Sequence, residues 1–146
     1  MIQQYNLQRF LDAQENTYSR AYSELDQGRK QSHWMWFIFP QILGLGQSET
    51  SKFYGIKSLE EATLFLSHPI LGSRLISISN LLLKLETNDP QSVFGSPDDL
   101  KLFSSMTLFN HIPNADPVFQ KVLNKYFCGK EDIKTLNITA GHHYYK

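Results

Sequence analysis

Residues 29–48 hold more side chains able to bind a ligand than any other stretch of this 146-residue sequence. An indole, Trp34 or Trp36, can stack on a planar ligand, and the cation Arg29 can meet its anionic groups. Gln41 adds an amide, and backbone N–H groups of the following Gly-Leu-Gly run could hold an anion. The same stretch also fits a core helix pair or hairpin whose glycines only make turns, and the sequence leaves both interpretations open.

His33 lies in the middle of this stretch, directly before Trp34. Histidine is the side chain best suited to take up and release protons near neutral pH. If the protein is an enzyme, His33 is therefore our candidate catalytic acid or base, and hydrolysis or group transfer fits these residues better than redox chemistry.

Gln14 is a polar residue in an otherwise apolar helical stripe that includes Leu7, Phe10, Leu11 and Tyr18. A buried amide needs partners for its donors and its acceptor. Those partners are either neighbouring backbone groups or a ligand in a pocket that the Tyr18 hydroxyl also reaches.

A third candidate group lies on the helix predicted to begin at Pro97. Lys101, Ser104 and Ser105 follow Asp98 at spacings that bring side chains to one helix face. A lysine beside two hydroxyls is typical of an anion or phosphate site, and could in principle activate a serine. An Asp98–Lys101 surface pair, with the serines at a helix crossing, explains the pattern equally well.

Helix start signals recur along the chain and predict the elements that position these residues. Proline follows a polar residue at His68-Pro69, Asp89-Pro90, Ser96-Pro97 and Asp116-Pro117, and Ser58 with Glu61 forms a capping box. The predicted helices cover Leu7 to Gln27, Ser48 to Tyr54, the residues after Ser58, Pro69 to Glu86, Pro97 to Asn110, Pro117 to Phe127 and Asp132 to Leu136. The apolar run 34–39 fits a buried helix or a buried strand, and we favour the helix because no other segment offers a partner strand.

These patterns predict a mainly α fold, a compact domain of six to seven helices in an orthogonal or bundle-like arrangement. We expect residues 1–139 to form this domain and 140–146 to form a flexible tail without periodicity.

Composition narrows the class of protein. Hydrophobic residues make up 41% and aromatic residues 13%, which is too much apolar surface for a disordered chain. Fourteen basic residues balance fourteen acidic ones, so non-specific nucleic-acid binding is not expected. The lone Cys128, the absence of a signal-peptide pattern and the short apolar runs favour a cytoplasmic protein that does not span a membrane. No nucleotide-binding, hydrolase or metalloprotease motif is present, so no cofactor and no metal is predicted.

Several of these segments together resemble the bacterial family called domain of unknown function 1810. The residues that carry the resemblance are 12–14, 28–30, 32–41, 44–48, 54–56, 68–72, Phe94-Gly95, 97–99, Lys101-Leu102, 104–109, 127–129, Asp132 and Thr135-Leu136. The resemblance implies a mainly helical bacterial intracellular protein and no assigned catalytic residue. Members are often labelled calpastatin, but that inhibitor is a disordered chain and the aromatic content here contradicts the label.

The leading hypothesis is a pocket for a small, polar or anionic, planar ligand such as a nucleotide or nucleotide sugar. Its predicted lining comprises Gln14, Tyr18, Arg29, His33, Trp34, Trp36, Gln41, Lys101, Ser104 and Ser105. The alternative is a protein-interaction or regulatory module without chemistry, and it would require tryptophans exposed as a flat patch instead of lining a cavity.

Overall fold

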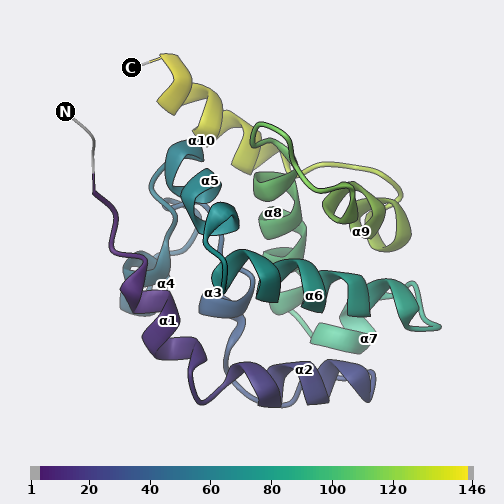
Figure 1. Cartoon of the computed structure of the whole chain (residues 1–146). Coiled ribbons are helices and arrows are strands. Elements are labelled where there is room, and N and C mark those ends of the chain that lie inside the picture. Colours follow the sequence, from purple (N-terminus) through teal and green to yellow (C-terminus); the bar gives the residue numbers. More distant parts are fainter. Residues whose placement is uncertain (1–3, 145–146) are drawn as a thin grey trace.

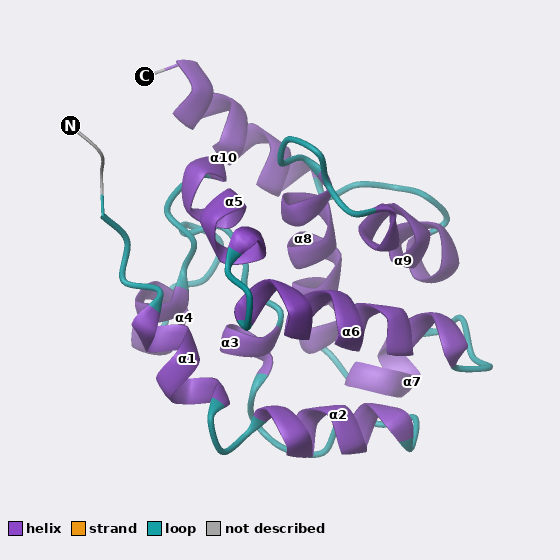
Figure 2. Cartoon of the chain, in the orientation of Figure 1, coloured by secondary structure: helices purple, strands orange, loops and turns teal. Residues whose placement is uncertain are grey.

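The computed structural model describes residues 4–144, and within them the protein is all-helical (Figures 1 and 2). The helices are α1 (Gln8–Gln14), α2 (Tyr18–Asp26), α3 (Met35–Ile38), α4 (Glu49–Tyr54), α5 (Leu59–Ser67), α6 (Leu71–Lys84), α7 (Pro90–Phe94), α8 (Asp98–Asn110), α9 (Pro117–Phe127) and α10 (Ile133–Tyr144). The predicted mainly α fold is confirmed. The helix count is higher than predicted because the segment Leu7 to Gln27 is split in two and the short helices α3 and α7 add to the predicted segments.

Local capping explains where the predicted helices begin. The Ser58 hydroxyl accepts a hydrogen bond from Glu61 N–H at the start of α5, and Asp116 accepts one from Val118 N–H before α9. At His68-Pro69 the imidazole Nδ1 accepts from the N–H groups of Ile70 and Leu71, and α6 begins at Leu71, two residues later than predicted. Each cap satisfies a backbone donor that has no partner inside the helix.

The prediction of one long helix over Leu7 to Gln27 is wrong. The chain turns between α1 and α2, where Thr17 N–H donates to the Gln14 carbonyl, and asparagine and threonine in this turn are poor helix formers. The turn also lets the Gln14 amide reach into the core, where its Nε2 donates to the Phe37 carbonyl at 2.8 Å. A buried amide bond thus outweighs continuation of the helix.

Helix α8 lies at the centre of the fold and packs against α5, α7, α9 and α10, while α6 crosses in front of it and contacts α2, α5 and α9 (Figure 1). The core between them is strongly aromatic. Its largest fully buried side chains include Phe10, Phe39, Phe65, Phe109 and Phe119, several of them in edge-to-face or tilted ring contacts. This packing makes α8 a rigid support for side chains on its remaining face.

The apolar run 34–39 contains the short helix α3, so the preferred helical interpretation is confirmed. The chain after α3 runs beside the segment after α4 through a single bridge, in which Ile56 N–H donates to the Gln41 carbonyl and Leu43 N–H to the Ile56 carbonyl. Gly55 allows this close approach, because a Cβ there would lie 2.9 Å from the Leu43 Cα. The bridge fixes Gln41 beside the end of α4.

The C-terminal helix is longer than the predicted Asp132 to Leu136 segment. Helix α10 continues to Tyr144, so it includes much of the predicted flexible tail, while residues 145 and 146 lie outside the described part of the chain. Across residues 4–144, no helix combines the length and the apolar character needed to cross a bilayer.

Candidate functional site beside helix α8

A groove of about 320 Å³ lies between α8, the start of α10 and the segment that joins α3 to α4. We call it the α8 groove, and its lining residues are Gln41, Leu45, Gly46, Ser51, Pro97, Leu100, Lys101, Phe103, Ser104, Asp132 and Lys134. Leu45, Pro97, Leu100 and Phe103 form its apolar lining, which we call the apolar wall, and the other lining residues apart from Gly46 are polar. The volume is at the lower end of the range for small-molecule sites.

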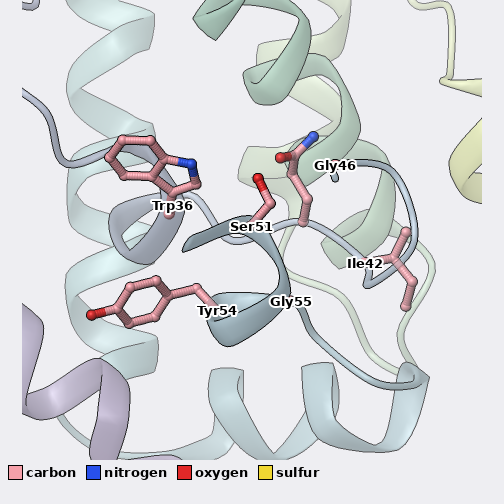
Figure 3. A pocket seen from close by; sticks show the side chains of 7 residues that line it. Trp36, Ile42, Gly46, Ser51, Tyr54 and Gly55 are labelled. Atoms are coloured by element: carbon pink, nitrogen blue, oxygen red, sulfur yellow. The ribbon is translucent and has the colours of Figure 1, made fainter. Parts of the chain in front are cut away.

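A smaller hollow adjoins this groove, and we call it the Trp36 pocket. It is lined by Trp36, Gln41, Ile42, Gly46, Ser51, Tyr54 and Gly55, and has room for about one water molecule (Figure 3). The two hollows share Gln41, Gly46 and Ser51. Figure 3 shows the nitrogen edge of the Trp36 indole turned toward the Ser51 hydroxyl. Gly46 keeps the shared boundary open, because a Cβ there would lie 2.5 Å from Ser51 Oγ.

Lys101 links the two hollows. Its Nζ lies 4.8 Å from the centre of the Trp36 ring and 3.4 Å from Asp98 Oδ1. Asp98 is held more closely by Lys30, whose Nζ lies 2.7 Å from Oδ2 and whose side chain is only 8% exposed. The closer Lys30 pair already neutralises the Asp98 charge. The positive charge of Lys101 is therefore available to attract an anion in the groove.

The charges around the groove leave a modest positive excess. The ammonium groups belong to Lys30, Lys101 and Lys134, and the carboxylates belong to Asp98 and Asp132, which leaves one net positive charge. Such a site favours a ligand of low negative charge over a polyanion.

Asp132, like Ser51 and Lys134, lines the groove but is not among the predicted site residues. It comes directly before α10, where an aspartate followed three residues later by Thr135 indicates a helix start and gives no hint of a site. Its Oδ2 accepts hydrogen bonds from Ser104 Oγ at 2.8 Å and Thr135 Oγ1 at 2.7 Å. The packing of α10 against α8 brings this carboxylate into the groove with Lys101.

Gln14 and Tyr18 are predicted site residues that lie outside the α8 groove and form a separate group with Arg74. Besides its bond to Phe37, the Gln14 amide oxygen accepts from Arg74 Nη1 at 3.2 Å. The Tyr18 hydroxyl donates to the Arg74 carbonyl at 3.0 Å, and the Arg74 guanidinium lies over the Tyr18 ring. These polar groups have protein partners, so they join α1 and α2 to α6 and do not line the α8 groove.

Trp34 is fully buried, and Glu24 on α2 holds its position. The Glu24 carboxylate accepts from Trp34 Nε1, from the N–H groups of Gln31 and Ser32, and from Ser32 Oγ. Lys30 Nζ lies 5.0 Å from the centre of the Trp34 ring. The Glu24 network thus anchors the turn that carries Lys30 toward Asp98.

Arg29 and His33 are exposed and do not line the groove. The predicted residues that the structure brings together are Trp36, Gln41, Lys101 and Ser104. The two tryptophans do not form an exposed patch of the kind that the interaction-module alternative requires, since Trp34 is fully buried and Trp36 lines a pocket.

Ser104 and Ser105 occupy different environments although they are neighbours. Ser105 is fully buried, and its Oγ has no hydrogen-bond partner within residues 4–144, whereas Ser104 is bonded to Asp132.

We expect Ser105→Ala to leave stability unchanged or raise it by about 1 kcal/mol, because it removes an unpaired buried hydroxyl. Ser104→Ala should lower stability by about 1 kcal/mol. Thermal and urea unfolding measure both, and a loss of stability in Ser105→Ala equal to that in Ser104→Ala would contradict the assignment.

Comparison with known proteins agrees with this fold. The family described as "Protein of unknown function (DUF1810)" matches residues 4–139. The crystal structure of the conserved hypothetical protein Rv1873 from Mycobacterium tuberculosis is similar over 93% of this chain and 97% of that chain, with 46% sequence identity and a TM-score of 0.91. No curated protein matches the chain.

Proposed function

This chain belongs to the DUF1810 family of proteins of unknown function, and from its geometry we propose that it binds a small, anionic, partly planar ligand in the α8 groove. A nucleoside monophosphate is the chemical type that fits best. The observation that carries the proposal is the convergence of the Gln41 amide, Lys101 and Lys134, from three separate segments, on one groove that also has an apolar wall.

The polar side of the groove offers both donors and acceptors. Within residues 4–144, neither the Gln41 side-chain amide nor Trp36 Nε1 has a hydrogen-bond partner, and Lys101 is held only by the longer of the two Asp98 ion pairs. Lys134 adds a second cation. A few convergent polar groups beside apolar lining are typical of small-molecule sites, so their position around these two adjoining hollows supports a ligand.

The apolar wall suits a planar ring. Leu45, Leu100 and Phe103 belong to it, and the Phe103 ring packs at a tilt against Phe127 with ring centres 4.7 Å apart. A ring against this wall would place an attached anionic group toward Lys101. The Trp36 pocket is too small for a ring, so the role we propose for Trp36 is donation from Nε1 and contact with Lys101, without stacking on the ligand.

Hydrolysis or group transfer on the bound ligand is an extension of this proposal. Lys101, Asp132 and Lys134 are the ionisable residues that line the groove, whereas His33 is exposed outside it. Incubation of the protein with nucleoside monophosphates, followed by mass spectrometry of the mixture, tests turnover separately from binding.

Lys101→Met is the substitution that tests the binding site. It removes the ammonium group but keeps an apolar stem against Trp36, and the Lys30–Asp98 pair remains to hold α8. We expect the affinity for AMP to fall roughly ten- to hundredfold, the usual size of a lost charge-assisted hydrogen bond. Isothermal titration calorimetry with AMP measures this change.

Arg29→Ala is the matched control. It also removes one positive charge, but from an exposed position that does not line the groove. Its affinity for AMP should stay within about twofold of the wild type. Equal affinities for the wild type and Lys101→Met, or no binding of any nucleoside monophosphate by the wild type, would refute the proposal. A mass-spectrometric search for metabolites that copurify with the wild type, but not with Lys101→Met, identifies the natural ligand.

A further inference from the structure

We infer that Asp132 makes the α8 groove selective for anions that carry hydroxyl groups, such as the ribose diol of a nucleotide, over anions that lack them. This inference rests on the proposed function and names the ligand class of the same site. It concerns which ligands bind, whereas the Lys101 experiment concerns whether an anion binds.

Three hydrogen bonds hold Asp132 in place, one through its backbone and two through its carboxylate. Its backbone N–H donates to Thr107 Oγ1 at 2.9 Å, and its Oδ2 accepts from Ser104 and Thr135. Thr107 and Ser104 belong to α8, and Thr135 belongs to α10, so both helices hold the group. A carboxylate fixed in this way does not need to be ordered when a ligand binds, which favours a directional hydrogen bond.

The second carboxylate oxygen, Oδ1, has no hydrogen-bond partner within residues 4–144, and Asp132 lines the groove. An ionised carboxylate only accepts hydrogen bonds, so a ligand group that replaces water at Oδ1 must be a donor. A hydroxyl or amino group supplies one, whereas a bare phosphate oxygen would be repelled by the negative charge.

Lys101 and Lys134 line the same groove as Asp132. The combination of two ammonium groups and one rigid carboxylate fits a ligand with an anionic group at one end and hydroxyl donors beside it. A phosphorylated sugar has both features, and a nucleotide adds the planar ring that the apolar wall accepts.

A purely structural role for Asp132 at the start of α10 predicts something different. As a helix cap it would affect stability alone, and any substituent that caps equally well would leave ligand selection unchanged. Asn is such a substituent. Asp132→Asn keeps an oxygen for the Ser104 and Thr135 hydroxyls, and it places an NH₂ donor where Oδ1 was, so an acceptor becomes a donor and a negative charge is lost.

AMP and 2′,3′-dideoxyadenosine 5′-monophosphate form the matched pair of probes, because they differ only in the ribose hydroxyls. We expect the wild-type protein to bind AMP about tenfold more tightly or better. In Asp132→Asn the preference should fall to within about twofold, because AMP binds more weakly while the dideoxy compound binds equally or more tightly. Calorimetric titration of both proteins with both ligands measures the four affinities.

The outcomes separate this inference from the proposed function. Equal wild-type affinities for the two nucleotides, or an unchanged preference in Asp132→Asn, overturn the inference while leaving the binding site intact. Failure of the wild type to bind either nucleotide overturns the proposed function and the inference together. Ser104→Ala is the control for stability, because it removes one bond of Asp132 but keeps the carboxylate, and it should keep the preference for AMP, whereas loss of the preference in this variant would favour a structural role for Asp132.

Discussion

Glu61→Ala should destabilise the protein by about 3–5 kcal/mol, the usual effect of removing one partner from a buried ion pair. Arg9 Nη1 lies 2.9 Å from Glu61 Oε2, with the side chains only 3% and 0% exposed. Without Glu61, the Arg9 guanidinium stays buried without a counter-charge, and Lys57 N–H loses the acceptor that Glu61 Oε1 gives it. Chemical unfolding with urea measures the loss.

The Arg9–Glu61 pair also supports the candidate site. Arg9 Nε donates to the Phe53 carbonyl at 2.8 Å and Nη2 to the Gly55 carbonyl at 3.0 Å, which fixes the end of α4 next to the Trp36 pocket. Glu61→Ala should therefore weaken AMP binding as well as stability.

Two further variants interpret the Glu61→Ala result. Glu60→Ala changes an exposed neighbour on the same helix and should shift stability by less than about 1 kcal/mol. The double variant Arg9→Met/Glu61→Leu removes both charges and should recover part of the loss, though not all, because the Phe53 and Gly55 carbonyls still lose their donors. A stability of Glu61→Ala within about 1 kcal/mol of the wild type would show that the pair is not important for folding.

Most helices could be predicted because their start signals are local. Helix α9 begins at Pro117 after the Asp116 cap and ends at Phe127, as predicted, since capping and periodicity depend only on neighbours in the sequence. The turn between α1 and α2 could not be predicted, because it depends on the bonds of Gln14 to Phe37 and Arg74, which are 23 and 60 residues away.

The candidate site, like the helices, could be predicted only where the signal lies in residues that are neighbours in the sequence. Trp36 and Lys101 stand out in the sequence as an aromatic residue in a basic stretch and a lysine beside hydroxyls, and the structure places them in contact. Gln14 stands out equally, but a buried amide satisfied by protein has the same sequence signature as one that meets a ligand. Asp132 gave only a capping signal, because its approach to Lys101 depends on the packing of α10 against α8.

Acid should remove a second large contribution to stability, through Glu24. Partial burial raises the pKa of this carboxyl, but hydrogen bonds from Ser32 Oγ, Gln31 N–H, Trp34 Nε1 and Ser32 N–H together lower it by more, from 4.5 to about 2. The folded state therefore prefers the ionised form. The resulting stabilisation is fully present above about pH 5 and is lost as the pH falls from there to about 2.

Full conversion of this pKa difference gives about 3 kcal/mol, which we reduce to about 2 kcal/mol because the carboxylate is partly exposed to solvent. Glu24→Gln keeps the shape but loses the charge, so it should be about 2 kcal/mol less stable than the wild type at pH 7 and nearly equal to it at pH 2. Asp26→Asn, an exposed change on the same helix, should follow the wild-type curve at every pH.

Urea unfolding of the three proteins between pH 2 and 7 measures these curves, with tryptophan fluorescence reporting on Trp34, whose indole N–H the Glu24 carboxylate binds. The difference between wild type and Glu24→Gln should grow between pH 2 and 5 and stay constant above that range. A constant difference over the whole range would mean that the carboxylate acts through its two acceptor oxygens and not through its charge. In that case the negative charge of Glu24 would not be what holds the turn that carries Lys30. Lys30 pairs with Asp98, which is also the partner of Lys101, so the charge would have no role in positioning the groove lysine.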